Sequence, residues 1–351
     1  MSGEWLIYGA YGYTGQLIAL EARKRGMQPV IGGRTAGPLT QLAGKTGFRH
    51  VVLDLDEPKR LRRHLEDISL VLNCAGPFSA TAPDLIDACI DTGTHYLDIT
   101  GEIDVFEYAQ SRHAAAKNHG IVICPGVGFD VVPTDCLAAT LKNAMPDGTL
   151  LALGFDARAS LSPGTAKTTL SRLPDGGKIR VDGEIRTVPL AYRTRTIDFG
   201  NGAKLAMTIP WGDVSTAFHT TGIPNITTWI PASEKLIGQL KRIDRLRRIL
   251  GWGWVQRLVR RQIEKKVHGP TQRERDADTT YVWGELRNDA SDLRTARLTT
   301  ANGYTLTVLA SIEICQYVLT HTVTPGAYTP AALMGSKFVC TLPGSSQIDV
   351  I

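Results

Sequence analysis

The segment from Trp5 to Gly15, WLIYGAYGYTG, is an apolar run that ends in three closely spaced glycines. Residues 16–25, which follow, have the pattern of a helix. Gly9 and Gly12 would let the backbone turn tightly and approach a phosphate, and Gly15 would let the helix pack on the strand. The N-terminus of that helix would face the anion. This pattern predicts a strand, a turn and a helix that together bind the pyrophosphate of a dinucleotide.

A second predicted strand, residues 29–33, ends directly before Arg34 and Thr35. At this position an NAD site carries Asp or Glu, which accepts hydrogen bonds from the ribose 2′-hydroxyl, whereas a cation suits the 2′-phosphate of NADP. A guanidinium can bind that phosphate with two hydrogen bonds and can stack on adenine. Arg34 therefore predicts NADP(H), the alternative being a solvated arginine after a strand.

Strands and helices alternate through the first 145 residues, with further predicted strands at 51–55, 69–74, 96–99 and 121–124. This rhythm predicts a Rossmann-type parallel sheet with ligands at the carboxyl ends of its strands. The cofactor-binding residues predicted on this basis are Gly9, Ala10, Tyr11, Gly12, Tyr13, Thr14, Gly15, Gly33, Arg34, Thr35, Asp54, Cys74, Ala75, Gly76, Pro77, Phe78, Gly128 and Phe129.

The pattern changes at about Thr149 to strand-rich sequence separated by turns, with alternating segments at 185–199, 204–210, 279–287 and 293–300. It predicts a second α+β domain on a mostly antiparallel sheet that supplies a substrate pocket and a dimer contact. The predicted division is a Rossmann domain over 1–145 and a second domain over 146–324.

The net charge of +5 is small for a chain of 351 residues, and the basic residues concentrate in residues 234–268. Apolar residues recur there at helical spacing, which predicts two basic amphipathic helices joined at 251–253. Three interpretations stay open for this segment: core packing, docking of an acidic partner such as an acyl carrier protein, and binding to a membrane surface. No nucleic-acid partner is predicted.

The six cysteines are scattered without C-x-x-C spacing, which favours reduced thiols and a cytoplasmic location, with peripheral membrane association left open. The first strand starts near Trp5, so no signal peptide is expected. The longest apolar stretch, 306–319, is short and interrupted by polar residues, so no transmembrane span is expected. The histidines show no metal-binding spacing, so no metal is predicted.

The candidate proton donors are Asp130, after the strand at 121–124, and Lys167, at the start of a predicted helix. Asp130 and Asp135 flank Pro133 and could instead cap the following helix, as Glu102 could cap the helix near Val105. Lys167 could equally be solvated. Cys74 is a possible nucleophile by position, although a small thiol at a strand end more often serves packing.

The chain resembles the saccharopine dehydrogenase-like oxidoreductases in several motifs. These are the glycine loop of residues 9–15, the pair Gly33-Arg34, and the segments 73–78, 96–102 and 125–130. The resemblance is strongest in the first half and extends over nearly the whole chain. Within that superfamily, segments 210–216 and 326–331 resemble the trans-acting enoyl reductases, which are found beside polyketide and lipid assembly enzymes. The resemblance implies that the glycine loop, Arg34 and the turn from Ala75 to Phe78 contact NADP. It also implies that the C-terminal segment, 325–351, returns to the first domain.

Three functions are open on this basis. The first is NADPH-dependent reduction of an apolar, carrier-bound or lipid-like enoyl or carbonyl group. The second is an amino-acid or imine dehydrogenase of the saccharopine type, which would need cations converging on the carboxylates of its substrate. The third is a non-catalytic NADP-binding or membrane-associated scaffold.

Overall fold

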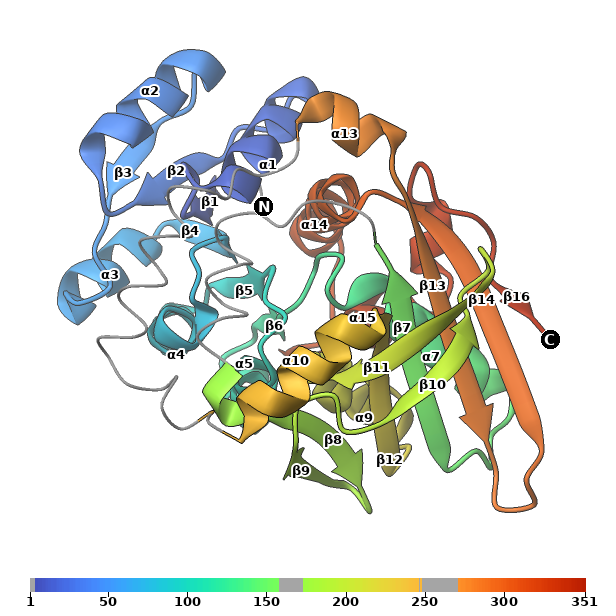
Figure 1. Cartoon of the computed structure of the whole chain (residues 1–351). Coiled ribbons are helices and arrows are strands. Elements are labelled where there is room, and N and C mark those ends of the chain that lie inside the picture. The colour runs from blue at the N-terminus through green and yellow to red at the C-terminus, as the bar shows by residue number, and fades with distance from the viewer. Residues whose placement is uncertain (1–3, 158–172, 246, 248–270) are drawn as a thin grey trace. The chain divides into compact units, whose positions relative to one another are not determined.

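The computed structural model describes residues 4–157, 173–245, 247 and 271–351, and these form two compact units (Figure 1). Unit 1 comprises residues 1–132 and 304–334, and unit 2 comprises residues 133–303 and 335–351. Lys167 and residues 248–268 of the basic segment lie outside the described residues.

Unit 1 contains a seven-stranded parallel sheet with the order β15-β6-β5-β4-β1-β2-β3. Its strands are β1 (Glu4–Tyr8), β2 (Val30–Gly33), β3 (His50–Val52), β4 (Ile68–Asn73), β5 (His95–Asp98), β6 (Val122–Cys124) and β15 (Gly326–Ala327). The chain runs outward from β1 through β2 to β3, then returns to β4 on the other side of β1. A parallel sheet of this order has its ligand crevice where the order reverses, between the carboxyl ends of β1 and β4.

The helices of this unit include the connections between successive parallel strands of its sheet. They are α1 (Tyr13–Lys24), α2 (Ala36–Thr46), α3 (Pro58–Leu65), α4 (Ala82–Thr92), α5 (Ile103–Ser111), α6 (His113–Asn118), α14 (Gly303–Thr320) and α15 (Pro330–Met334), with a 3-10 turn η1 (Phe78–Ala80). Proline stands in the first turn of α4, where its fixed φ suits a helix start, and Gly93 ends the helix at a φ of 71°. The helices α5 and α6 are separate, because Arg112 between them leaves helical geometry.

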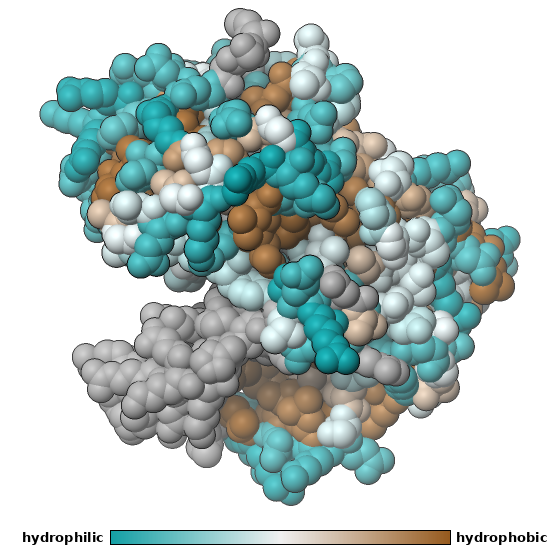
Figure 2. Space-filling view, turned by 90° about the horizontal axis from the view of Figure 1, so that it is seen from above, coloured by the Kyte–Doolittle hydropathy of each residue, from teal (hydrophilic) through white to brown (hydrophobic). Residues whose placement is uncertain are grey.

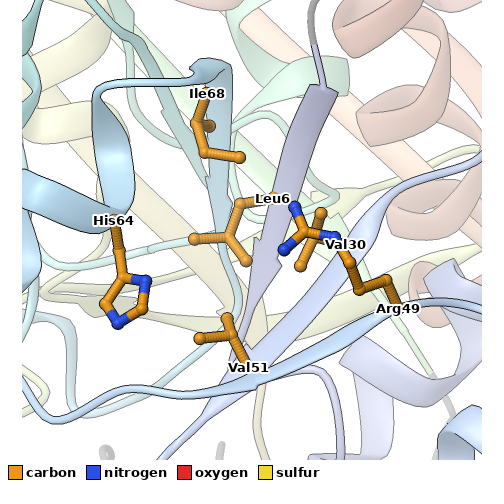
Figure 3. A pocket seen from close by; sticks show the side chains of 6 residues that line it. All are labelled: Leu6, Val30, Arg49, Val51, His64 and Ile68. Atoms are coloured by element: carbon orange, nitrogen blue, oxygen red, sulfur yellow. The ribbon is translucent and has the colours of Figure 1, made fainter.

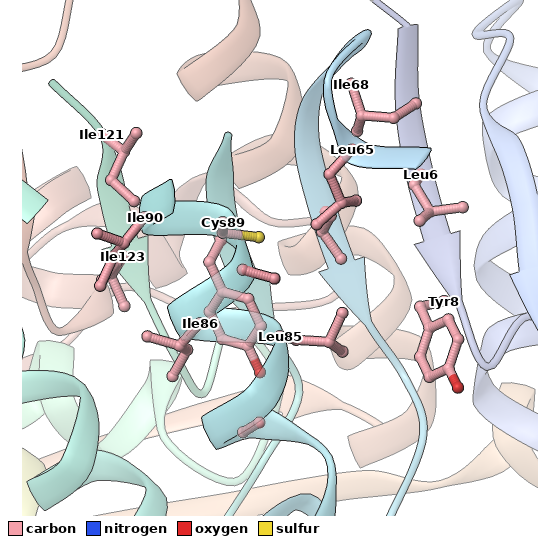
Figure 4. Close-up of a cluster of buried hydrophobic side chains, with 14 of the residues drawn as sticks. Leu6, Tyr8, Leu65, Ile68, Leu85, Ile86, Cys89, Ile90, Ile121 and Ile123 are labelled. Carbon is pink, nitrogen blue, oxygen red and sulfur yellow. The ribbon is translucent and has the colours of Figure 1, made fainter. Parts of the chain in front are cut away.

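An apolar core lies between α4 and the strands of this sheet (Figure 4). Leu85, Ile86 and Cys89 on α4 are completely buried and belong to one cluster with Leu6 of β1 and Ile123 of β6. Full burial of such a side chain contributes about 1.5 to 3 kcal/mol to folding. This packing fixes the strands, and therefore the turns at their carboxyl ends.

Unit 2 contains a nine-stranded mixed sheet in which β12 and β7 are parallel and the other pairs are antiparallel. Its strands are β7 (Leu150–Asp156), β8 (Gly177–Val181), β9 (Glu184–Val188), β10 (Thr194–Asp198), β11 (Ala203–Ile209), β12 (Asn225–Pro231), β13 (Thr279–Arg287), β14 (Leu293–Ala301) and β16 (Asp349–Val350). The longer helices in its described part are α7 (Val132–Ala144), α9 (Asp213–Thr221), α10 (Glu234–Asp244) and α13 (Gln272–Ala277). The predicted fold class, a parallel Rossmann-type sheet plus a mostly antiparallel second sheet, is confirmed.

The sheet of unit 2 bends so that β10 reaches strands that are not its neighbours. The guanidinium carbon of Arg195 on β10 lies 4.8 Å and 5.0 Å from the ring centres of Trp229 and Trp283. Its Nη1 is 2.9 Å from Oε1 of Glu285 on β13. A bent sheet buries aromatic side chains that a flat one would expose on this face, and both tryptophans are almost completely buried.

The compact units divide the chain at other positions than the predicted boundaries. The helical residues after Pro133 belong to unit 2, because Leu137 and Leu141 of α7 pack against Gly284 of β13. Residues 304–334 belong to unit 1, whereas 335–351 belong to unit 2. Backbone hydrogen bonds explain this split of the C-terminal segment, since β15 pairs with β6 and β16 pairs with β14.

The described part of the basic segment contains one helix, α10. Its Ile237 and Leu240 pack against apolar residues of β11 and β12, as the core-packing interpretation requires for that face. Leu236 and Ile243 remain 41% and 36% exposed beside the exposed Lys235 and Arg242.

Much of the surface in Figure 2 is hydrophilic, with hydrophobic residues gathered in smaller patches. The partner of helix α10, if any, stays a prediction.

Candidate cofactor site

The glycine loop after β1 has a backbone that leaves no room for side chains. Gly9 has a φ of 75°, and a Cβ there would lie 2.7 Å from the nitrogen and 2.8 Å from the Cα of Ala75. The amides of Gly9 and Ala10 both donate to the carbonyl of Gly32, at 2.9 Å and 3.1 Å. The loop is therefore tied to β2 and in contact with the turn after β4, which places it at the reversal of strand order.

Helix α1 begins directly after this loop, with Gly12 as a cap that has no side chain. A Cβ at Gly15 would lie 2.5 Å from the carbonyl oxygen of Gly9, so the helix packs on the loop backbone. The amides of the first helical turn have no acceptor within the helix, and they carry the positive end of its dipole. The glycines, the close backbone and the uncapped helix start fit a pyrophosphate.

Arg34 follows β2 as an exposed residue. No ion pair or hydrogen bond from its side chain is found in the described part of the chain. The ring of Tyr11 covers Gly33, because a Cβ there would lie 2.6 Å from the ring, and the Tyr11 hydroxyl lies 3.4 Å from Oγ1 of Thr35. Asp54 follows β3, and its carboxylate accepts the amide of Asp56 at 3.3 Å. A guanidinium placed in this way fits a 2′-phosphate.

The turn after β4 is fixed at its start by two side chains. Oδ1 of Asn73 accepts the amide of Ala75 at 2.9 Å, and Oγ1 of Thr81 donates to the Ala75 carbonyl at 2.7 Å. The bond between Gly76 and Pro77 is cis. Burial holds the pKa of the Cys74 thiol far above its usual range, which disfavours the thiolate and favours the packing interpretation.

Two buried carboxylates hold this turn and the next two, and sequence reasoning did not find that role. Glu102 accepts the amide of Phe78 at 2.8 Å on Oε1 and the amide of Ser79 at 3.0 Å on Oε2. Oδ1 of Asp98 accepts the amides of Thr100 and Gly126, both at 2.9 Å. The prediction that Glu102 could cap the helix near Val105 is wrong for its side chain, because Glu102 is the N-cap of α5 without a side-chain cap.

The pKa of Asp98 is raised to about 7 because burial disfavours its charge, although the Thr100 and Gly126 amides and the Tyr96 hydroxyl oppose this shift. The hydroxyl of Tyr96 donates to Oδ2 of Asp98 at 2.9 Å and accepts from Nδ2 of Asn73 at 3.2 Å. Asn73, Tyr96 and Asp98 therefore connect the ends of β4 and β5 through side chains in the middle of the sheet.

The turn after β6 holds Gly128, Phe129 and Asp130. The amide of Phe129 donates to Oγ1 of Thr307 at 2.9 Å, and a Cβ at Gly128 would lie 2.8 Å from Cγ2 of Thr307. The carboxyl of Asp130 lies against Gly101, and desolvation raises its pKa to about 7. A carboxyl group with this pKa holds a proton in an appreciable fraction of molecules at neutral pH.

The other candidate acids have different surroundings. Asp135 is buried in unit 2 and accepts a hydrogen bond from the hydroxyl of Thr220. Lys167 lies outside the described residues. The structure therefore brings Asp130, the glycine loop and the turn after β4 to one edge of the unit 1 sheet, and leaves the roles of Asp130 and Lys167 as predictions.

A small pocket lies elsewhere in unit 1 (Figure 3) and is lined by Leu6, Val30, Arg49, Val51, His64 and Ile68. Val30 and Ile68 are the first residues of β2 and β4, so the pocket is near the amino ends of the strands. Ligands of such sheets bind at the carboxyl ends, and this pocket is therefore not the cofactor site. In the described residues, no group of three His, Cys, Asp or Glu is arranged to hold a metal ion, and no helix could cross a membrane.

Residues 5–124, which include the glycine loop, Arg34 and all six strands before β7, match the family described as saccharopine dehydrogenase NADP binding domain. The chain is similar to the saccharopine dehydrogenase-like oxidoreductases over this region. Residues 5–124 are an NADP-binding domain of that type, and the predicted cofactor, NADP(H), is confirmed.

The curated relatives of this chain share moderate sequence identity with it. The saccharopine dehydrogenase-like oxidoreductase of Bos taurus is 26% identical over 215 residues, which cover 53% of this chain and 50% of that protein. The trans-acting enoyl reductase of Mycobacterium ulcerans (strain Agy99) is 30% identical over 203 residues, which cover 54% of this chain and 47% of that protein. The chain thus spans about half the length of these relatives. The matched regions cover about half of this chain, whereas the resemblance was expected over nearly all of it.

A solved structure shares the fold along the full length of the chain. The saccharopine dehydrogenase (L-Glu forming) of Saccharomyces cerevisiae has a TM-score of 0.66 at 12% identity, with 100% of both chains covered. At this identity the similarity concerns the fold alone.

Proposed function

We propose that this oxidoreductase reduces an apolar, carrier-bound or lipid-like enoyl or carbonyl group with NADPH. The observation that carries the proposal is the carboxyl group of Asp130, whose pKa is raised to about 7 at the sheet edge that also bears the glycine loop. Reduction of an activated double bond needs a hydride and a proton, and an acid with this pKa suits the second task. The 30% identity to a trans-acting enoyl reductase supports the choice of an enoyl substrate.

Bound NADPH would supply the hydride, and the protein would bind it and handle the proton. The glycine loop would hold the pyrophosphate and Arg34 would hold the 2′-phosphate. Asp130 keeps a proton on its carboxyl oxygen and gives it to the α carbon of the substrate. Lys167, predicted from sequence as the alternative donor, would protonate the same carbon in place of Asp130.

The basic segment 234–268 supports a carrier-bound substrate, because an acyl carrier protein is acidic. We further propose that the protein works as a homodimer in the cytoplasm. A membrane surface is the competing partner for the same segment, since anionic lipids also attract basic amphipathic helices.

The test is NADPH oxidation with a panel of trans-enoyl thioesters of increasing chain length, free and on an acyl carrier protein. We expect oxidation with at least one thioester, and faster oxidation on the carrier. Turnover of an amino-acid imine, together with no reaction of any thioester, would establish the dehydrogenase alternative. Binding of NADPH without turnover of either class would favour the scaffold.

Replacing the acid gives a second test. Asp130→Asn should slow reduction by about 100-fold or more, the usual contribution of a general acid. In the wild type, kcat should fall as the pH rises through about 7, because Asp130 loses its proton there. Asp67→Asn, at an exposed position, is the matched control and should keep the wild-type rate. A kcat in Asp130→Asn equal to that of the wild type would assign the proton to another group.

A further inference from the structure

We propose that Glu102 is a positioning residue that holds the turn from Ala75 to Ser79 in the conformation in which it receives NADPH. This inference uses the NADP-binding domain and does not depend on the enoyl substrate. Glu102 is 3% exposed, and each of its two carboxylate oxygens accepts one backbone amide of that turn.

The position of Glu102 in the chain does not account for this arrangement by itself. Its backbone carbonyl accepts the amides of Val105 and Phe106, as expected for the N-cap of α5. An N-cap carboxylate commonly binds amides of its own helix. Here the side chain instead crosses to a turn more than twenty residues earlier in the chain. The buried charge is thus used between segments and not within α5.

The turn that Glu102 holds is in direct contact with the phosphate loop. Ala75 lies so close to Gly9 that a methyl group on Gly9 would overlap its backbone. Asn73 and Thr81 fix the turn at Ala75, and Glu102 fixes it three and four residues later. With Glu102 removed, only one end of the turn keeps its side-chain hydrogen bonds, so the surface beside the pyrophosphate would lose its fixed shape.

The backbone of Glu102 is itself held by the turn after β5. Its amide donates to Oγ1 of Thr100 at 3.0 Å, and the Thr100 amide donates to Asp98. Asp98 also accepts the amide of Gly126, from the turn after β6. The three turns at the carboxyl ends of β4, β5 and β6 are therefore connected through two carboxylates. Because these turns lie on the side of β1 away from Arg34, we assign Glu102 to the nicotinamide half of the cofactor.

The experiment compares two ligands. NADPH reaches both halves of the site, whereas adenosine 2′,5′-bisphosphate carries only the adenine, its ribose and the two phosphates near Arg34 and the glycine loop. In Glu102→Gln, the volume is kept but the amide group can accept only one of the two backbone amides. We expect this variant to bind NADPH about tenfold more weakly or worse, as measured by calorimetry, and to bind the bisphosphate as the wild type does.

Three variants complete the design. Glu102→Asp keeps the charge on a shorter side chain and should restore part of the NADPH affinity. Asp104→Asn removes an exposed carboxylate two residues away and should leave both affinities unchanged. Arg34→Asp should weaken both ligands, because both carry the 2′-phosphate.

The proposal is overturned if Glu102→Gln binds NADPH as the wild type does, or if it loses equal affinity for both ligands. It is also overturned if neither Glu102 variant folds, because the carboxylate would then serve the fold and not the site. The assay contains no enoyl substrate, so its result is separate from a failure of the proposed reaction.

Discussion

The glycine loop of residues 9–15 and the turns after β4, β5 and β6 lie at one edge of the same sheet, but they are held in different ways. The loop keeps its conformation because it has no side chains at Gly9 and Gly15, where a Cβ would overlap backbone atoms. The later turns are fixed by buried carboxylates, Asp98 and Glu102, that accept backbone amides from distant segments. The first kind of site depends on steric fit, and the second depends on hydrogen bonds to buried carboxyl groups.

The comparison predicts the largest effect where steric fit is tightest. Gly9→Ala forces a side chain into a left-handed backbone position and against Ala75. We expect the free energy of unfolding to fall by about 3 kcal/mol and NADPH binding to be lost. Urea unfolding and calorimetry measure the two effects. Gly44→Ala, in α2 with open space around it, is the control and should stabilise the protein by up to about 1 kcal/mol. Similar effects of the two changes would show that steric fit at Gly9 does not fix the loop.

The next prediction concerns Arg34, whose exposed charge follows β2, the strand to which the glycine loop is tied. Arg34→Asp should weaken NADPH binding by about 1.5 to 3 kcal/mol, the contribution of charged hydrogen bonds to a phosphate, and leave NADH binding unchanged. Titration of both nucleotides measures this difference. Lys59→Asp makes the same change of charge at an exposed residue of α3 and should have no such effect. Equal NADPH affinity of wild type and Arg34→Asp would place the 2′-phosphate elsewhere.

The buried carboxyl of Asp98 should make the stability of the protein depend on pH. Its pKa is about 7 in the folded protein against a usual value of 3.8, so the folded state favours the protonated form. The stability from this group is complete below about pH 4 and is lost as the pH rises through about 7. The shift of Asp130 has the same sign.

In Asp98→Asn, the decrease in unfolding free energy between pH 4 and pH 7 should be smaller than in the wild type by about 3 kcal/mol. Asp130 would account for part of the slope that remains. Chemical denaturation at a series of pH values measures it. A variant with the full wild-type slope would show that Asp98 titrates normally.

The smallest effect is expected in unit 2, where a charge serves packing. Arg195 lies between two tryptophan rings and pairs with Glu285, but its side chain is 34% exposed. Arg195→Met should reduce the free energy of unfolding by about 1 kcal/mol. Combining it with Glu285→Gln should cost little more, because the pair is already broken. A loss as large as that in Gly9→Ala would mean that the bent sheet depends on this charge.

Most of unit 1 could be predicted from the sequence because its signals are local. The segment from Trp5 to Gly15 contains the strand, the turn and the helix start, and Arg34 stands next to the end of β2. In unit 2 the strands β13 and β14 were predictable from their alternation. The strands β7 and β12 were not assigned, and they run parallel to each other in the middle of the sheet. Parallel pairing joins segments far apart in the chain, so no turn signal marks it.

The sequence alone determined the type of the N-terminal domain and the cofactor, because glycine spacing and one arginine restrict the backbone and the charge within a short segment. Only the tertiary structure decided how Glu102 and Asp98 are used, since their partners are 24 and 28 residues away at Phe78 and Gly126. It also decided that residues 304–334 join unit 1, where Thr307 holds the turn at Phe129. The physical reason is burial: a carboxylate removed from water must find donors, and only the folded chain shows which amides are within reach.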